Sequence, residues 1–174
     1  MAMVGEKAPE WTASAYFQGK KITIGSQDFE NQWYVLYWWP FDYAGICNSE
    51  IHGFQMLYER FKSINVHLVG ASCDSYFVHE QWFKSASFTN INRPTHPIVA
   101  DNTHALSTLF GVYNDSLGCA FRATMLIAPD TEIKSMSVNH LSVARDPRDI
   151  LVTAQAFVGG KACSLPIRQK IQGL

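Results

Sequence analysis

One stretch of the sequence, residues 35–51, most constrains what this chain can fold into. It starts with a continuous apolar run that ends at Pro40. A short turn-forming segment that contains Asp42 follows, and a helical pattern of apolar residues begins near Ile46. This order predicts a buried strand, a loop and a helix whose first turn carries Cys47.

The predicted place of Cys47 has a chemical consequence. The first turn of a helix has unpaired backbone N–H groups and a partial positive charge, and both stabilise a thiolate. Apolar residues recur at helical spacing from Cys47, which predicts that its side chain lies on the buried face; they are Ile51, Phe54, Tyr58 and Phe61. Two interpretations stay open: a nucleophile or redox centre, and a structural cysteine of the kind common in protein cores.

Composition limits the classes of partner. The 174 residues are enough for one domain with a sizeable core, and the net charge of −1 gives no reason to expect nucleic-acid or membrane binding. No apolar run approaches the roughly 18 residues of a membrane-spanning helix, and the first residues lack a secretory signal pattern. The four cysteines form no C-x-x-C pair and no metal-binding cluster with histidine. We therefore expect no metal and no cofactor, and an intracellular, cytoplasmic protein with reduced thiols.

The rest of the chain predicts alternating strands and helices. Strands are expected at residues 12–17, 21–24, 33–39, 66–72, 97–101, 120–128 and 132–138. Helices are expected at residues 46–63, after an N-cap at Ser75, at residues 103–111 and at residues 149–157. In the last helix Ile150, Leu151, Ala154 and Phe157 are expected to face inward. This order favours an α/β fold with a mixed central sheet and helices on both faces.

Arg122 stands out because it lies in an apolar strand, where a lone charged side chain costs free energy unless it is paired. One interpretation is a salt bridge on an edge strand. The other is a cation beside the Cys47 thiolate.

Around Cys47 the sequence resembles the active-site signature of the peroxiredoxins, a family of thiol-dependent peroxidases. That signature has a Pro, three residues, a Thr or Ser, two residues and the reactive Cys, commonly followed by Pro-Thr-Glu. Pro40, Cys47 and Glu50 match it, whereas Ala44 stands at the Thr or Ser place and Asn48 at the second Pro place.

Three further segments, residues 72–82, 97–112 and 138–145, are similar to motifs of the same family in the same order. The resemblance therefore covers nearly the whole chain. It implies a thioredoxin-like fold and the typical two-cysteine group, which includes alkyl hydroperoxide reductase C. It also implies a peroxidase domain at residues 1–158 and a C-terminal tail at residues 159–174.

The resemblance implies roles for the matching residues. Cys47 would attack a peroxide oxygen and become a sulfenic acid. Arg122 would stabilise the thiolate and the leaving oxygen. Glu50 would hold Arg122 and Arg145 in position, and Pro40 would shield the pocket.

The tail carries Cys163, at a place similar to that of the family's resolving cysteine, although Ser164 replaces the usual Pro. The resemblance implies a Cys47–Cys163 disulfide between the subunits of a homodimer, often assembled as a ring of five dimers. A thioredoxin-like or other dithiol would then reduce that disulfide. A spare tail thiol is the alternative interpretation of Cys163.

Ala44 is the main departure from the family pattern. The family's hydroxyl at this place hydrogen-bonds the peroxide and the thiolate, and loss of one such donor typically costs on the order of a hundredfold in rate. Ser49 and a backbone N–H are the candidate substitutes. The alternative function is a ring of the same fold that acts as a redox sensor or holdase chaperone with weak peroxidase activity.

Overall fold

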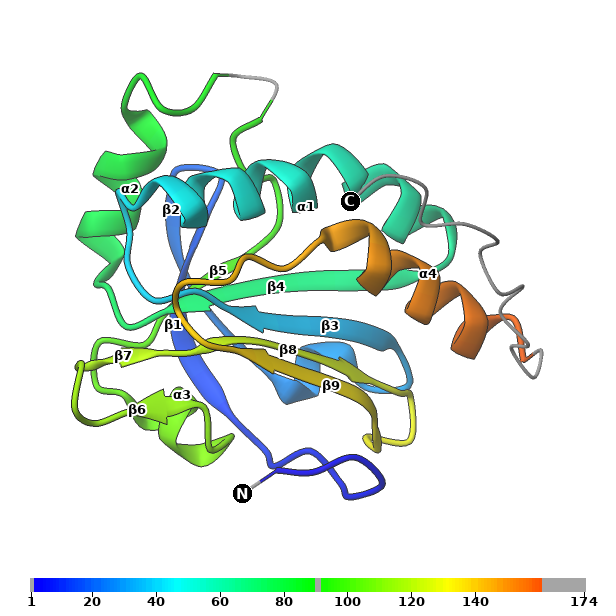
Figure 1. The fold of residues 1–174 in the computed structure, drawn as a ribbon. Coiled ribbons are helices and arrows are strands. Elements are labelled where there is room, and N and C mark those ends of the chain that lie inside the picture. The colour runs from blue at the N-terminus through cyan, green and yellow to red at the C-terminus, as the bar shows by residue number, and fades with distance from the viewer. Residues whose placement is uncertain (1, 90–91, 161–174) are drawn as a thin grey trace, which may run out of the picture.

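A seven-stranded mixed sheet forms the centre of the molecule in the computed structural model, which describes residues 2–89 and 92–160 (Figure 1). The strand order is β2-β1-β5-β4-β3-β8-β9. Neighbours β5, β4 and β3 run parallel, and the other neighbouring pairs are antiparallel. The strands are β1 (Thr12–Phe17), β2 (Lys20–Gly25), β3 (Trp33–Trp38), β4 (Val66–Ser72), β5 (Ile98–Ala100), β8 (Arg122–Ile127) and β9 (Ile133–Asn139).

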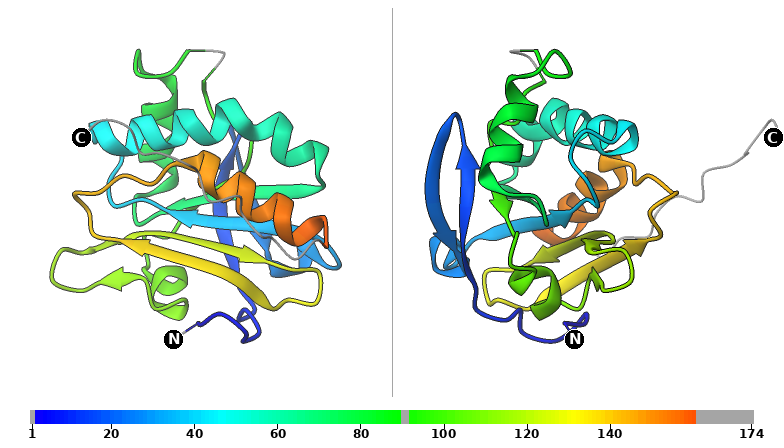
Figure 2. Two further views of the ribbon diagram at one scale, coloured as in Figure 1. Left: turned by 45° about the vertical axis from the view of Figure 1, so that its right-hand side comes forward. Right: turned by 90° about the vertical axis from the view of Figure 1, so that its left-hand side faces the viewer.

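Helices cover both faces of this sheet, as the sequence predicts. One face carries the three longest helices, α1 (Gly45–Ser63), α2 (Tyr76–Lys84) and α4 (Pro147–Val158), as Figures 1 and 2 show. The other face carries shorter elements: the 3-10 helix η1 (Ser26–Phe29), α3 (Ala105–Leu109) and the hairpin of β6 (Tyr113–Asn114) and β7 (Cys119–Ala120). Within the described residues, every helix is too short or too polar to cross a membrane.

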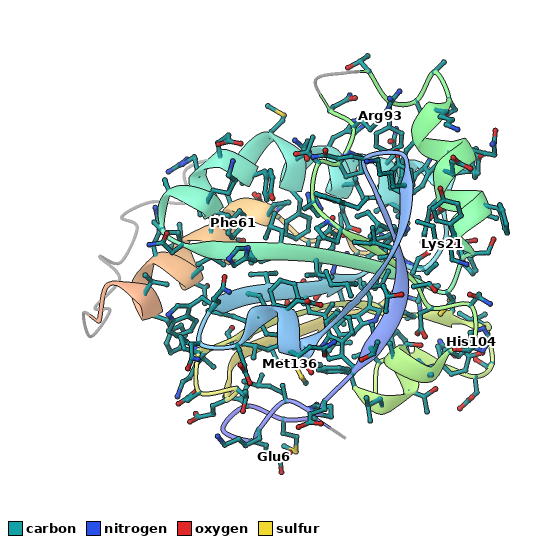
Figure 3. The ribbon with its side chains drawn as sticks, turned by 180° about the vertical axis from the view of Figure 1, so that it is seen from behind. Glu6, Lys21, Phe61, Arg93, His104 and Met136 are labelled. Carbon is teal, nitrogen blue, oxygen red and sulfur yellow. The ribbon has the colours of Figure 1, made fainter. Side chains whose placement is uncertain are left out.

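Burial on both faces explains the continuous apolar run of β3. Successive side chains of a strand point to opposite faces of the sheet. Tyr34, Leu36 and Trp38 pack into the core cluster on the α3 side, which we call the first core. Val35 and Tyr37 of β3, together with Trp39, pack into the second core, beneath α1, α2 and α4. Figure 3 shows side chains filling these spaces, with Phe61 between α1 and the sheet.

A glycine in β4 leaves room for the large side chains of the second core. A Cβ atom on Gly70 would lie 2.8 Å from both Ile98 Cδ1 and Trp39 Cζ3, and 2.9 Å from Tyr37 Cζ. Those contacts are shorter than side chains tolerate, so a larger residue at position 70 would displace Trp39. Gly70 thereby allows Trp39, which begins the loop towards Cys47, to lie against the sheet.

Two expectations from the sequence were wrong. The strand expected at residues 120–128 is divided, because the N–H of Phe121 donates to the carbonyl of Val112 at 2.9 Å, outside the ladder of the main sheet. Phe157 was expected to face inward, but it is 42% exposed and lies beside Trp33, near the end of α4. Ser75 does cap α2, because its hydroxyl accepts from the N–H of Val78.

Candidate active site

Cys47 lies in the first turn of α1 and is fully buried. The helix starts after Ala44, whose carbonyl accepts from the N–H of Asn48 at 3.0 Å. The buried face predicted for this helix is confirmed for Ile51, Phe54 and Phe61, while Tyr58 is half-buried. The Cys47 thiol therefore lies at the positive end of α1, in a position sheltered from water.

Arg122 lies directly beside this thiol. Its Nη1 atom is 3.3 Å from Cys47 Sγ and 2.7 Å from Glu50 Oε2, and its Nε atom donates to the carbonyl of Leu141 at 2.8 Å. Only 3% of Arg122 is exposed. Of the two interpretations of Arg122, the structure therefore favours the cation beside Cys47, although an ion pair is part of that arrangement.

Glu50 joins two arginines in one buried cluster. Besides Arg122, its carboxylate accepts from the backbone N–H of Arg145 at 2.8 Å, from Arg145 Nε at 3.2 Å and from Arg145 Nη2 at 3.1 Å. Glu50 is 1% exposed. A single carboxylate leaves one of the two guanidinium charges uncompensated. The Cys47 sulfur lies against one of these guanidinium groups, 3.3 Å from Arg122 Nη1.

The remaining donors of Arg145 attach the cluster to the sheet. Arg145 Nη1 donates to Thr124 Oγ1 at 3.0 Å and to the carbonyl of Ala123. The guanidinium carbon lies 5.5 Å from the centre of the Tyr37 ring and 5.8 Å from that of Phe54, within cation–π range. These contacts hold the cluster between α1 and β8.

The structure separates the two candidate substitutes for the missing hydroxyl at position 44. Ser49 is exposed, and its hydroxyl donates to the carbonyl of Ile46 at 2.8 Å, so it does not serve the thiol. Ala44 has no side-chain oxygen to accept from the first turn. Within the described residues, no hydrogen bond uses the N–H of Cys47. Backbone N–H groups of this turn thus remain as donors, and Pro40, at the start of the preceding loop, is buried.

The other described cysteines have different surroundings. Burial raises the pKa of the Cys73 thiol to about 11, against a weaker opposing effect of its contact with Ser107. Burial also raises the pKa of Cys119, and the neighbouring charge at Cys47 adds to this effect. Both environments disfavour a thiolate. Cys163 lies outside the described residues.

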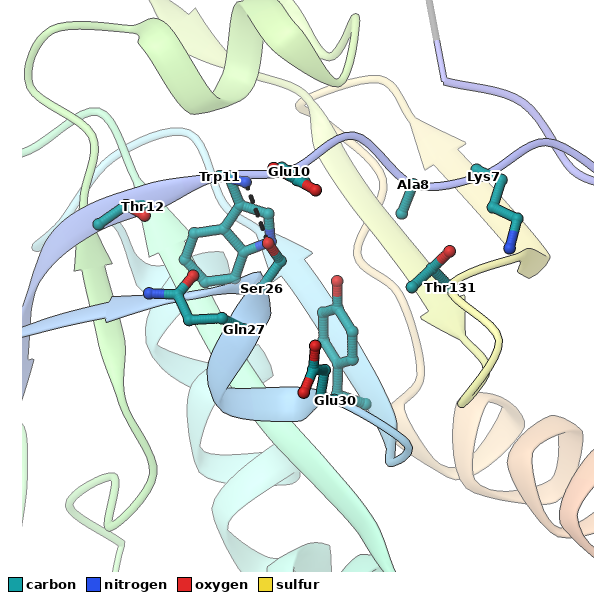
Figure 4. Close-up of a pocket in the computed structure, with 10 residues that line it drawn as sticks. Lys7, Ala8, Glu10, Trp11, Thr12, Ser26, Gln27, Glu30 and Thr131 are labelled. Atoms are coloured by element: carbon teal, nitrogen blue, oxygen red, sulfur yellow. Dashed lines mark hydrogen bonds between the residues drawn. The ribbon is translucent and has the colours of Figure 1, made fainter.

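A surface pocket of about 540 Å³ is separate from this cluster (Figure 4). Trp11 and Tyr34, both members of the first core, form part of its wall, with Glu10 and Glu30 at its edge. Cys47 belongs to the second core, on the other face of the sheet. The pocket is therefore not part of the candidate active site.

Sequence reasoning did not find a buried polar pair beneath the loop before α1. His79 Nδ1 lies 2.6 Å from Asp42 Oδ2, and both side chains are at most 1% exposed. The available signal was a carboxylate in the turn-forming segment and a histidine on the apolar face of α2. Nothing local in the sequence indicates that these two residues meet.

A buried cysteine in the first turn of a helix, 3.3 Å from a guanidinium, is an arrangement suited to a thiol-dependent peroxidase, here on a thioredoxin-like sheet. Similarity to known proteins indicates the same class. The family model described as AhpC/TSA family matches residues 4–136. Peroxiredoxin prdx-2 of Caenorhabditis elegans is 31% identical over 157 residues, covering 90% of this chain and 78% of the relative. Alkyl hydroperoxide reductase C of Bacillus subtilis (strain 168) is 28% identical over 156 residues, covering 90% and 82%.

Solved structures agree with this assignment. The reduced 2-Cys peroxiredoxin of Plasmodium vivax matches with a TM-score of 0.87 and 27% identity, covering 100% of this chain and 92% of that one. AhpC of Mycobacterium tuberculosis matches with a TM-score of 0.84 and 26% identity, covering 94% and 97%. This chain belongs to the AhpC/TSA family, as a peroxiredoxin of its typical two-cysteine group, and the resemblance found in the sequence is confirmed. It is a thiol-dependent peroxidase, and the sensor or chaperone alternative is not favoured.

The buried cluster generates a stability prediction. Glu50→Gln removes the negative charge between two buried arginines, so we expect the free energy of unfolding to fall by about 3–5 kcal/mol. Urea unfolding measures it. The matched control is Glu59→Gln on the same helix, where an exposed carboxylate contacts Lys62 at 3.0 Å and little loss is expected. Equal effects of the two substitutions would contradict the account of Glu50.

Proposed function

We propose that this chain reduces hydrogen peroxide and alkyl hydroperoxides through a sulfenic acid on Cys47. The observation that carries the proposal is the 3.3 Å contact between Arg122 Nη1 and Cys47 Sγ. The thiolate attacks one peroxide oxygen, a new S–O bond forms and the O–O bond breaks. The leaving oxygen takes a proton and departs as water or an alcohol, and the sulfur is oxidised to the sulfenic acid.

Each residue around the thiol has a part in this proposal. Arg122 stabilises the thiolate and the charge that develops on the leaving oxygen. Glu50 holds Arg122 against Cys47 and also binds Arg145, which is a positioning residue. Pro40 shields the pocket from water. Backbone N–H groups of the first turn of α1 take the place of the hydroxyl that Ala44 lacks.

The oxidised thiol needs a second thiol to return to its reduced form. We propose Cys163 for this role, in a tail at residues 159–174 that follows a peroxidase domain at residues 1–158. The Cys163 thiol attacks the sulfenic sulfur, a disulfide forms and water leaves. A thioredoxin-like or other dithiol then reduces the disulfide and is itself oxidised.

A homodimer, assembled further as a ring of five dimers, is the proposed form of the protein. Support for a dimer comes from β9, an edge strand of the main sheet whose Val138 is 43% exposed. Such an edge can pair with a second copy of itself. Further assembly is supported by exposed aromatic side chains near the start of α1 and on α2, where Phe41, Tyr43 and Phe77 are 45%, 57% and 70% exposed.

The proposed location is the cytoplasm. Cys47, Cys73 and Cys119 are free thiols, which fits a reducing compartment.

The alkyl hydroperoxide reductase C of Bacillus subtilis, a relative of this chain, supports the alkyl hydroperoxide part of the proposed substrate class.

The first test measures the rate at which hydrogen peroxide oxidises Cys47. Stopped-flow fluorescence of Trp39 and Trp82, which share the second core with Cys47, reports oxidation. We expect the rate with hydrogen peroxide to exceed that of a free thiolate by at least about a hundredfold, and Arg122→Ala to remove most of this advantage. Arg148→Ala, at an exposed arginine, is the control and keeps the rate. A wild-type rate no better than that of a free thiolate would overturn the proposal.

Restoring the hydroxyl at position 44 tests the departure from the family pattern. Ala44→Thr adds one donor next to the thiol, and we expect the peroxide rate to rise by about tenfold or more. Ala44→Val has the same branched shape without the hydroxyl, so it should bring no gain. A similar rise in both variants would mean that the hydroxyl is not what the site lacks.

Non-reducing electrophoresis after peroxide treatment tests the proposed disulfide. The wild-type protein should form disulfide-linked dimers, because Cys47 and Cys163 belong to different subunits in the proposal. Cys163→Ser should abolish these dimers, whereas Cys73→Ser should keep them. Linked dimers that persist without Cys163, or a disulfide found within one subunit, would contradict the assignment.

A further inference from the structure

The loop between β3 and α1, residues 39–44, rests on a buried polar network. Asp42 is its centre: Oδ1 accepts from Trp39 Nε1 at 2.8 Å, and Oδ2 lies 2.6 Å from His79 Nδ1. The backbone N–H of Asp42 donates to Asp74 Oδ2 at 2.9 Å, and the Ser72 hydroxyl is 3.4 Å from Asp42 Oδ1. These contacts tie the loop to β4 and α2.

Both ring nitrogens of His79 face acceptors. Nδ1 faces the Asp42 carboxylate, and Nε2 lies 3.2 Å from the carbonyl oxygen of Val99 in β5. These two contacts fix the orientation of the imidazole ring between the loop and β5. His79 is fully buried and the Asp42 side chain is 1% exposed, so the hydrogen bond between them is sheltered from water.

The second carboxylate of the network does not compete for this histidine at hydrogen-bond distance. Asp74 accepts from the Asp42 N–H and from the Ser72 hydroxyl. Burial, and secondarily the charge on Asp42, raises the pKa of Asp74. The hydrogen bond between His79 and Asp42 is therefore the contact that connects the network to α2.

His96 gives an internal comparison. It is as buried as His79, but its Nε2 contacts the Tyr37 hydroxyl at 2.8 Å instead of a carboxylate. Burial lowers the pKa of His96 to about 3, so this histidine is neutral. The two residues differ in their partners, and only His79 is attached to the loop that leads to Cys47.

The position of Asp42 in the loop explains how its contact with His79 can affect the pocket at Cys47. Asp42 lies two residues after Pro40 and two residues before Ala44. Two residues span at most about 7 Å of chain, so fixing Asp42 fixes both neighbours within narrow limits. Because Ala44 has no hydroxyl, the pocket depends on the backbone of this segment, and a displacement of about 1 Å can cost on the order of a hundredfold in rate.

We propose that His79 is a positioning residue of the peroxide reaction, which acts through Asp42 to hold Pro40 and Ala44 over Cys47. The inference rests on the proposed function, because it concerns the same pocket. It adds a residue on α2 that touches neither the thiol nor the arginine cluster in any hydrogen bond described for this chain. The contact between Arg122 and the Cys47 thiol does not involve His79.

The test compares the rates of Cys47 with hydrogen peroxide and with iodoacetamide in His79→Gln. The peroxide rate should fall by about tenfold or more, because the pocket loses its alignment. The alkylation rate should stay the same or rise, because Arg122 is untouched and a looser loop admits the larger reagent. His96→Gln is the matched control, a buried histidine away from the loop, and should keep the wild-type ratio of the two rates.

A double variant tests the route through Asp42. Asp42→Asn should reproduce the fall, and combining it with His79→Gln should cost no more than either change alone, because the two residues act as one unit. Asp42→Asn also decides the matter if His79→Gln does not fold. The inference is overturned if these variants keep the wild-type ratio, or if His96→Gln lowers it equally. A wild-type peroxide rate at the free-thiolate level would instead overturn the proposed function.

Discussion

The carboxylate of Glu50 is the contact on which the active site depends. It bonds two arginines that are 72 and 95 residues away in the chain, and it thereby joins α1, β8 and the segment before α4. Without it, two guanidinium groups would repel each other in a medium that screens charge poorly. The placement of Arg122 against the Cys47 thiol follows from this single buried anion.

Two groups of buried polar contacts lie near the first turn of α1. The cluster of Glu50 with Arg122 and Arg145 places one guanidinium group beside the Cys47 thiol. The contact between Asp42 and His79 joins the loop before α1 to α2. Separating the two partners of a buried ion pair or hydrogen bond is strongly unfavourable, because each partner is then left unsatisfied. Both therefore restrict the site to one geometry.

Because Ala44 has no hydroxyl, the position of the backbone in the first turn of α1 matters more in this chain. Where a side-chain hydroxyl caps a helix, it accepts a hydrogen bond from a backbone N–H of the first turn. Here the N-cap residue is Ala44, whose methyl group accepts no hydrogen bond. Within the described residues, the N–H of Cys47 makes no hydrogen bond. Those backbone donors do not adjust by rotating, as a hydroxyl does. Whether these N–H groups point at a bound peroxide therefore depends on the positions of the loop and of α1.

The sequence by itself determined the strand β3, the start of α1 and the burial of Cys47, because hydrophobic periodicity and turn residues act over a few neighbouring positions. With the family resemblance it also indicated Arg122, Glu50 and Arg145. Only the tertiary structure decided that Asp42 meets His79 and that Phe121 leaves the ladder of the main sheet. Such pairings join residues distant along the chain, and they are set by how whole elements pack, which no local pattern encodes.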